Sequence, residues 1–175
     1  HYLGVADAVG LPIMLQDIGT APLSPPLMAR LSRSHERIRY AKVETLPTPP
    51  RFVETAAMAG DKLRLFGGAN GQYFIEELNR GSRGTMQGIA IADVVRKVWD
   101  QYHGGDPDGA AMLWDRFSPL VKLCSIGQGM SPWLVKETLR RRGVISKAFP
   151  RLPARKPDDI AYRELHSLLD RLDLG

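Results

Sequence analysis

The chain has 175 residues, enough for one domain with a sizeable core, and an ordinary globular composition of 43% hydrophobic and 25% charged residues. Its net charge of +5 is spread along the chain except at Arg140–Arg142, a cluster that suits a helix end better than a nucleic acid. The single cysteine, Cys124, excludes an intrachain disulfide and a cysteine metal site, which favours a reducing compartment such as the cytoplasm. We expect no membrane span and no signal peptide, because no apolar run approaches the roughly 20 residues that a span needs.

The first segments alternate between helix and strand. Residues 1–9 have the apolar spacing of a helix, and because the chain starts within it we expect a fragment of a longer protein. Residues 11–17 form a short apolar run, which is typical of parallel strands buried on both faces. Ser24 is placed to cap a helix over residues 25–33 that has proline at its first position.

The next segment, Ile38–Glu44, predicts a strand with a lysine in its middle. Side chains alternate between the faces of a strand, so Ile38, Tyr40, Lys42 and Glu44 are expected to share one face. If that face is buried, loss of hydration favours the neutral amine of Lys42, which is then a usable nucleophile. The alternative is a lysine on a solvated strand face.

Two further strands follow. We expect a helix at 49–60 capped by Thr48, a strand at 63–68, a helix at 72–80, a strand at 84–90 and a helix at 91–102. Four strands that alternate with helices at this spacing predict a parallel sheet with right-handed crossovers.

The remainder of the chain is expected to be helical. Asp106 caps a helix at 107–124, a glycine-rich break lies at 127–129, Ser131 caps a helix that ends before residue 143, an extended link covers 149–156, and the last helix covers 158–172. The apolar positions of the last helix recur with helical spacing, as on a surface helix that packs on a core.

The predicted strands end in polar or small residues, which is where α/β folds place their sites. These residues are Gln16, Asp17, Glu44, Gly67, Gly68 and Gln87. Gln16 can hydrogen-bond a substrate hydroxyl, whereas Asp17 acts either as a base or as a loop cap. The glycine-rich stretch 67–71 lacks the pattern of a nucleotide-binding loop. It allows backbone to approach a small ligand or Lys42, or it forms a plain tight turn.

Lys42 is the leading catalytic candidate, as a former of a Schiff base. A lysine amine attacks the carbonyl of a 2-oxo acid, and the iminium that results stabilises the carbanion left by loss of a carbon group or a proton. Glu44 lies two residues further on the same face, where it can hold or move a proton or simply form a salt bridge. The four histidines are far apart in sequence, so we expect no metal site.

Taken together, the segments resemble the second half of the dihydrodipicolinate synthase / N-acetylneuraminate lyase superfamily. The stretches that carry the resemblance are His1–Leu3, Ala8–Leu15, Ala41–Glu44, Leu65–Gly68, Arg80–Gly84, Gly104–Asp106, Trp114, Pro119–Leu120, Val135–Lys136, Gly143–Ile145 and Arg151–Pro153. Their order and spacing cover nearly the whole chain.

The resemblance implies the second half of a (β/α)₈ barrel, strands five to eight over residues 1–104, followed by a C-terminal helical extension over residues 105–175. It implies a Schiff base at Lys42 with a 2-oxo acid such as pyruvate, no cofactor, and a tetramer or dimer. The other partner that it implies is the missing N-terminal half of the barrel, because strands one to four and their carboxylate-binding segment are absent. It implies neither a nucleic acid nor a membrane as a partner.

The chain departs from the family pattern at the end of the fifth strand. Gln16 stands where many members have the proton-relaying tyrosine, and Ala21 falls near the position of the carboxylate-binding arginine. With Lys42 and Glu44 on the next strand, this ending resembles the branch of 2-keto-3-deoxy sugar acid dehydratases, including those that act on L-2-keto-3-deoxyarabonate. The resemblance thus implies a Schiff-base lyase, either a dehydratase or an aldolase of such an acid. The alternatives are a condensation with pyruvate and a non-catalytic relative that binds a small ligand.

Overall fold

The structure is a computed structural model, and it describes residues 1–127 and 129–174. The chain divides into two compact units, His1–Met86 and Gln87–Gly175. The break predicted at 127–129 includes Gln128, which lies outside the described residues. The boundary predicted between residues 104 and 105 concerns the complete barrel and stays a prediction.

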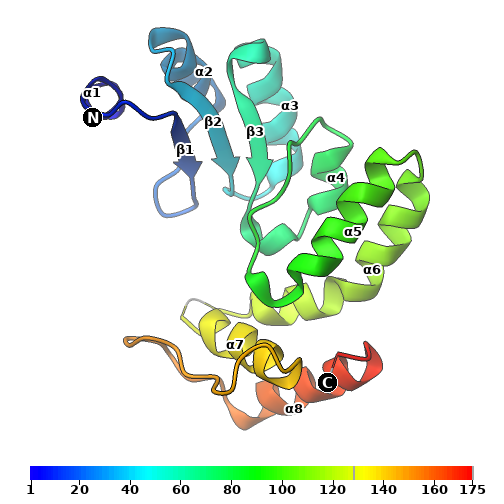
Figure 1. The fold of residues 1–175 in the computed structure, drawn as a ribbon. Coiled ribbons are helices and arrows are strands. Elements are labelled where there is room, and N and C mark those ends of the chain that lie inside the picture. Colours follow the sequence, from blue (N-terminus) through cyan, green and yellow to red (C-terminus); the bar gives the residue numbers. More distant parts are fainter. Residues whose placement is uncertain (128, 175) are drawn as a thin grey trace. The chain divides into compact units, whose positions relative to one another are not determined.

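The first unit contains a parallel three-stranded sheet in the order β1-β2-β3, with each strand followed by a helix (Figure 1). The elements are α1 (Tyr2–Ala8), β1 (Ile13–Asp17), α2 (Pro25–Ser34), β2 (Ile38–Val43), α3 (Thr48–Ala59), η1 (Gly60–Lys62), β3 (Arg64–Gly67), η2 (Ala69–Gly71) and α4 (Phe74–Leu78). Lys42 of β2 pairs with Gln16 of β1 and with Phe66 of β3, so these three residues form one row across the sheet. The three strands predicted first are confirmed.

The two faces of the sheet have different environments. On the outer face, Leu15, Ala41 and Val43 are buried in one cluster that includes Met28 of α2 and Phe52 of α3. On the inner face, the side chains of Met14, Gln16, Tyr40, Lys42 and Phe66 are all partly or fully exposed. From Tyr40 to Val43 the exposure of β2 alternates with the period of two along a strand. Ile38 was expected on the face of Lys42, but it is buried in the outer-face cluster, because the register with β1 shifts between Ile13 and Met14.

The fourth predicted strand, 84–90, is wrong except at one residue. Thr85 forms an isolated parallel bridge with Gly67, and residues Ile89–Ile91 form a 3₁₀ helix, η3. The segment begins at Gly84, whose φ of 138° is outside the range of a regular strand. No second strand pairs with this segment in the described part of the chain, so nothing extends the bridge into a ladder.

The second unit is helical apart from its connections. It contains η3, α5 (Ala92–His103), α6 (Pro107–Cys124), α7 (Ser131–Arg141) and α8 (Asp159–Arg171). α6 packs against α5 and α8, and Trp114 of α6 and Leu165 and Leu169 of α8 are all buried. None of the described helices is both long and apolar enough to cross a membrane.

Two of the four predicted helix caps, Ser24 and Asp106, are confirmed, and Asp158 is a further cap that was not predicted. Leu27 N–H donates to Ser24 Oγ at 3.4 Å, and the N–H groups that follow Asp106 and Asp158 donate to their carboxylates at 2.9 and 2.8 Å. Thr48 and Ser131 were expected to cap α3 and α7, but each is the first helical residue instead. In both cases a proline follows and removes a backbone N–H of the first turn, so fewer donors need a cap.

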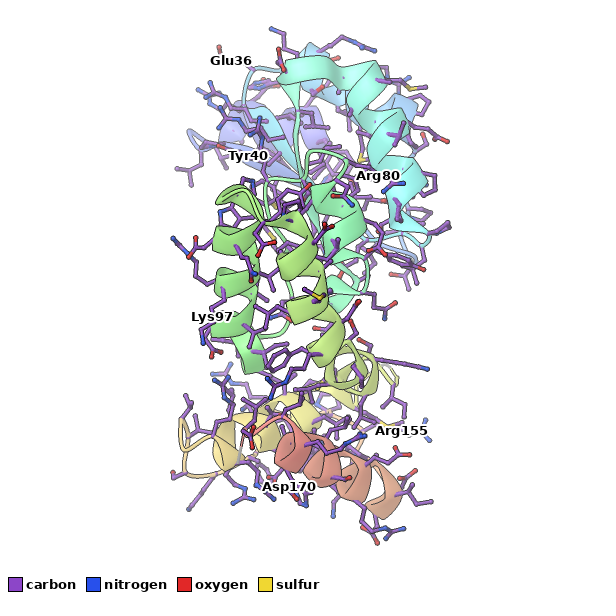
Figure 2. All side chains as sticks on the ribbon, turned by 90° about the vertical axis from the view of Figure 1, so that its right-hand side faces the viewer. Glu36, Tyr40, Arg80, Lys97, Arg155 and Asp170 are labelled. Carbon is purple, nitrogen blue, oxygen red and sulfur yellow. The ribbon has the colours of Figure 1, made fainter. Side chains whose placement is uncertain are left out.

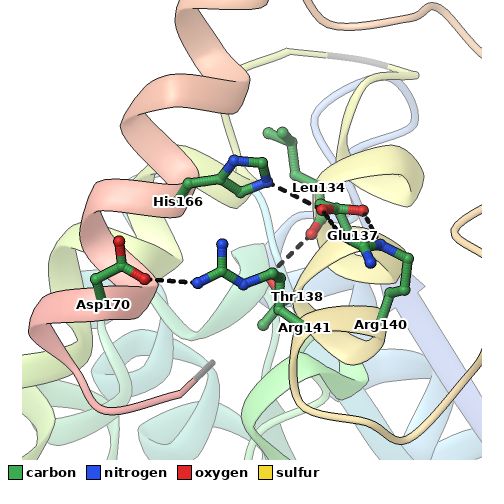
Figure 3. A network of polar contacts seen from close by, with 7 residues as sticks. All are labelled: Leu134, Glu137, Thr138, Arg140, Arg141, His166 and Asp170. Atoms are coloured by element: carbon green, nitrogen blue, oxygen red, sulfur yellow. Dashed lines mark hydrogen bonds and ion pairs between the residues drawn. The ribbon is translucent and has the colours of Figure 1, made fainter.

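The three consecutive arginines lie at the end of α7, and each forms an ion pair within the second unit. Arg140 binds Glu137, which also contacts His166 of α8, and Arg141 binds Asp170 of α8 (Figure 3). Arg142 binds both Asp93 carboxylate oxygens of α5, at 2.8 and 3.0 Å. These arginines therefore join helices of the second unit to one another. Other charged side chains, such as those of Glu36, Arg80, Lys97 and Arg155, are exposed (Figure 2).

Candidate functional site

The side chain of Lys42 lies on the inner face of the sheet near the carboxyl end of β2. It is 17% exposed, and its Nζ atom is 3.0 Å from Glu44 Oε2. Tyr40, labelled in Figure 2, precedes it on the same face and contacts the ring of Phe66 edge to face, with 6.1 Å between ring centroids. The amine thus contacts a carboxylate, on a strand face that also carries two aromatic side chains.

Glu44 binds donors from each strand end of the site. Its Oε2 atom accepts a hydrogen bond from Gln16 Nε2 at 3.1 Å, in addition to the ion pair with Lys42. Its Oε1 atom accepts from Ala69 N–H at 2.9 Å, just after β3. The backbone N–H of Glu44 donates to the carbonyl of Asp17 at 2.8 Å. Since donors from β1, β2 and the segment after β3 converge on one carboxylate, its position beside Lys42 is fixed.

Gly68 allows the close approach of backbone that the glycine-rich stretch predicted. A Cβ atom on Gly68 would stand 2.9 Å from Lys42 Cε and 2.8 Å from Glu44 Cγ, closer than a real Cβ tolerates. A Cβ on the preceding Gly67 would instead meet Glu77 Oε2 at 1.8 Å. The two glycines therefore face opposite sides of the sheet, and only Gly68 borders the Lys42 site.

Asp17 lies on the outer face, away from the amine of Lys42. It is fully buried, and its Oδ1 atom accepts hydrogen bonds from Leu23 N–H at 2.9 Å and Thr45 Oγ1 at 2.7 Å. Its Oδ2 atom binds Arg51 at 3.0 Å, and Arg51 also donates to the Leu23 carbonyl. This geometry fits the second interpretation of Asp17, in which it holds the loop after β1.

The structure therefore groups four of the predicted site residues, Gln16, Lys42, Glu44 and Gly68, within one set of contacts. Gln87, also predicted, is the first residue of the second unit.

One buried acidic residue near the site, Glu77, was not among the sequence candidates. It is 0% exposed on the short helix α4, and Thr48 Oγ1 donates to its Oε1 atom at 2.5 Å. The burial of Glu77 could have been predicted, because Phe74, Glu77 and Leu78 have the i, i+3, i+4 spacing of one buried helix face.

Comparisons with known proteins match one protein family along nearly the whole chain. The profile of the Dihydrodipicolinate synthetase family matches residues 1–172. L-2-keto-3-deoxyarabonate dehydratase of Azospirillum brasilense is 32% identical over 98% of this chain, and 4-hydroxy-tetrahydrodipicolinate synthase of Corynebacterium urealyticum is 30% identical over 100% of it. The chain spans only 56% and 57% of those two relatives.

Solved structures agree with this match. A putative dihydrodipicolinate synthetase from Pseudomonas aeruginosa superposes with a TM-score of 0.85 at 26% identity, covering 98% of this chain and 59% of that one. Dihydrodipicolinate synthase from Rhodopseudomonas palustris gives 0.87 at 24% identity, over 97% and 59%. The α/β fold is thus that of part of these structures. Because the match runs from the first helix to the last, the chain belongs to the Dihydrodipicolinate synthetase family.

Proposed function

We propose that the protein is a lyase that forms an iminium between Lys42 and a 2-oxo acid. The observation that carries the proposal is the convergence of Gln16 and Lys42 on a single carboxylate oxygen of Glu44, at 3.1 and 3.0 Å. An amine and a carboxylate in direct contact at the carboxyl end of parallel strands form a nucleophile and a proton carrier, the two groups that such a reaction needs. Membership of the family supports this interpretation.

The proposed reaction begins when the neutral amine of Lys42 attacks C2 of the 2-oxo acid. Water leaves, and the iminium that forms acidifies the protons on C3. Glu44, as a carboxylate, removes one of these protons, and the electron pair of that C–H bond forms the C3–C4 double bond as hydroxide leaves C4. The proton on Glu44 then reaches the leaving hydroxide to form water, and hydrolysis of the iminium restores Lys42.

Gln16 and Gly68 support this chemistry without reacting. Gln16 Nε2 donates to the oxygen of Glu44 that faces Lys42, which holds the carboxylate toward the amine in the absence of the tyrosine typical of the family. Gly68 leaves room for both side chains. We propose that Gly67 and Asp17 keep the strand ends in place and that Gln87 contributes to substrate binding.

A 2-keto-3-deoxy sugar acid is the substrate class that we favour, with dehydration ahead of aldol cleavage. The Gln16–Glu44 pair in place of a tyrosine relay supports this choice, as does the 32% identity with a dehydratase of such an acid. A condensation with pyruvate is the second candidate, because relatives at 30% identity are named 4-hydroxy-tetrahydrodipicolinate synthases. A non-catalytic relative that binds a small ligand is the third.

We further propose that β1, β2 and β3 are strands five to seven of a (β/α)₈ barrel, that the segment around Thr85, which bridges to Gly67, occupies the place of the eighth, and that the helical extension starts at residue 105. The partly exposed inner face of Tyr40, Lys42 and Phe66 supports this, because a closed barrel would line its interior with these side chains. A cytoplasmic tetramer or dimer stays a prediction, which light scattering of the purified protein tests.

The experiment that tests the proposed function is trapping of the iminium. The protein, made from its complete coding sequence, is treated with pyruvate or a 2-keto-3-deoxy sugar acid and borohydride, and its intact mass is measured. We expect one adduct on the parent and on Lys97→Ala, a control at an exposed lysine, and none on Lys42→Ala. No adduct with any 2-oxo acid, or an undiminished adduct on Lys42→Ala, would contradict the proposal.

Glu44→Gln separates binding from proton transfer. The amide keeps the shape of the side chain but removes the base, so we expect the adduct to form while turnover of the sugar acid falls by roughly 10²–10⁴-fold. Analysis of the product distinguishes a dehydrated acid from the fragments of an aldol cleavage.

A further inference from the structure

A buried carboxyl group, that of Glu77, lies on the outer face of the sheet at the carboxyl end of β3. Its Oε1 atom accepts a hydrogen bond from Thr48 of α3 at 2.5 Å. Its Oε2 atom lies 1.8 Å from the point where a Cβ on Gly67 would stand. The carboxyl group therefore rests directly against the strand backbone, at the residue before Gly68.

Two buried oxygen atoms lie beside Gly67, and neither has a hydrogen-bond partner among the described residues. They are Glu77 Oε2 and Thr85 Oγ1. Thr85 Oγ1 lies 3.2 Å from the same Cβ position on Gly67, with which Thr85 forms the parallel bridge. A hydrogen bond between the two oxygens can run in either direction, because a carboxylic acid donates to the hydroxyl and a carboxylate accepts from it.

The groups around Glu77 favour the neutral acid. Burial is the main cause that raises the pKa of Glu77 from 4.5 to about 8; the hydrogen bond from Thr48 opposes the rise, and Glu76 and Glu44 add to it. Arg51, a cation of α3, is already paired with another carboxylate. No ion pair to Glu77 occurs in the described part of the chain, so no cation there offsets the loss of hydration that a buried charge suffers.

We propose that Glu77 is a positioning residue of the Lys42 site. As a neutral acid it donates a hydrogen bond to Thr85 and accepts one from Thr48, and it thereby holds the end of β3 between α3 and the segment after Gly81. This inference rests on the proposed function in so far as it concerns the Lys42 site, but the arrangement of Glu77 can be tested without turnover.

The connection from Glu77 to the site is short and passes through backbone. Gly67 rests on Glu77, Gly68 packs against Lys42 and Glu44, and the next residue, Ala69, donates its N–H to Glu44 Oε1 at 2.9 Å. Loss of the Glu77 proton places a second negative charge across the strand from Glu44. The resulting repulsion loosens the hydrogen bond from Ala69, so this amide reports the state of Glu77.

The test is a pH titration of the Ala69 amide by NMR, in protein made from its complete coding sequence with ¹⁵N-alanine. Ala69→Gly assigns the signal, because glycine readily adopts the Ala69 φ of 45°. From about pH 6 to about pH 10 we expect the parent signal to titrate with a midpoint near 8. It should stay flat in Glu77→Gln, whose amide mimics the neutral acid, and titrate in Glu76→Gln, the control on the same helix.

Thr85→Val tests the direction of the hydrogen bond. If the acid donates to Thr85, removal of the acceptor lowers the midpoint of the titration. A midpoint that rises shows that Thr85 donates to a carboxylate, and this overturns the proposal. It is likewise overturned if the Ala69 signal of the parent does not titrate, or if it titrates in Glu77→Gln as in the parent.

Iminium trapping against pH separates this inference from the proposed function. In the parent we expect the rate of adduct formation at Lys42 to change near pH 8. This change should be absent in Glu77→Gln and present in Glu76→Gln. A change that persists in Glu77→Gln contradicts the role of Glu77 while the adduct itself supports the lyase. If no adduct forms on the parent, the proposed function fails, and the titration of Ala69 alone decides for or against Glu77 as a positioning residue.

Discussion

Two adjacent glycines at the carboxyl end of β3 leave space for side chains on opposite faces of the sheet. Gly67 leaves space for Glu77 on the outer face, and Gly68 leaves space for Lys42 and Glu44 on the inner face. Neither glycine has a positive φ, so the requirement is for space and not for an unusual backbone conformation. A methyl group at either position is therefore expected to displace the side chain that it meets, and this displacement is the expected cause of any loss of stability or activity.

Substitution Gly68→Ala is expected to damage the site more than the fold. The new Cβ would lie under 3.0 Å from atoms of Lys42 and Glu44, which are the ends of flexible side chains and must move away. We expect destabilisation of roughly 1–3 kcal/mol and a loss of turnover near ~10²-fold, because a small misplacement of reacting groups has large effects.

The control for this change is Gly19→Ala, where an added Cβ meets nothing within 4 Å. Urea unfolding gives the stability of both variants, and steady-state kinetics gives their turnover. Equal activity of Gly68→Ala and the control would show that Lys42 and Glu44 need not occupy the positions described.

At the scale of elements, side chains at the helix ends tie the second unit together. Glu137 of α7 accepts hydrogen bonds from Arg140 at 2.6 and 2.8 Å and lies 2.9 Å from His166 of α8 (Figure 3). The hydrogen bond from Arg140 lowers the pKa of Glu137 below 4.5, although partial burial opposes it, and His166 adds to the lowering. The stability that this carboxylate contributes is thus present above about pH 4.5 and lost as the pH falls through the lowered pKa.

Glu137→Gln is therefore expected to destabilise the protein at pH 7 and to have less effect in acid. Because Arg140 is largely solvated, we expect no more than about 1 kcal/mol at neutral pH. Urea unfolding at pH 7 and at a pH near 3.5 measures the difference, with Glu164→Gln, an exposed carboxylate on α8, as the control. A destabilisation of the same size at both pH values would mean that ionisation of Glu137 is not its source.

The elements show what the sequence could predict and what it could not. The strands at β1, β2 and β3 were predictable because short apolar runs ended by polar or glycine residues are local patterns. The 84–90 strand was not, because a ladder depends on a partner strand, which the local sequence does not reveal. Caps at Ser24, Asp106 and Asp158 follow from local chemistry, whereas the bond from Thr48 to Glu77 joins residues 29 apart.

The candidate site divides in the same way. The placement of Lys42 and Glu44 on one face follows from the alternation of a strand and was predictable. The contact of Gln16 with Glu44 depends on the register between β1 and β2, which the structure supplies. The opposite orientation of Asp17 follows from alternation too, since it is the neighbour of Gln16. Two of the three residues that donate to it, Thr45 and Arg51, lie 28 and 34 positions away in the sequence.

For the whole molecule, the inner face of the sheet is the surface that the proposed barrel must cover. Tyr40 and Phe66 are partly exposed there beside Lys42, while the outer face is buried by helices of the first unit. We expect the 175-residue chain, made alone, to bind a fluorescent apolar dye at this face, and the protein from the complete coding sequence to bind much less. Near-ultraviolet circular dichroism checks that the isolated chain is folded.

Phe66→Ser is expected to lower this dye binding, because it removes apolar surface from the inner face. Val53→Ser, an exposed residue of α3 on the other side of the unit, serves as the control and should have little effect. Equal dye binding by the isolated chain and the protein from the complete coding sequence would speak against a barrel closed over this face.

The residues of β2 that pack in the core and those that face the proposed site lie on opposite faces of the strand. Ala41 and Val43, both 0% exposed, point to the helices, while their neighbours Tyr40 and Lys42 point to the opposite side. Changes at Tyr40 or Phe66, on the inner face, are therefore expected to leave the helix-packed core intact. A directed-evolution library confined to inner-face positions should retain many folded members, so that new substrate preferences can be sought without first restoring stability.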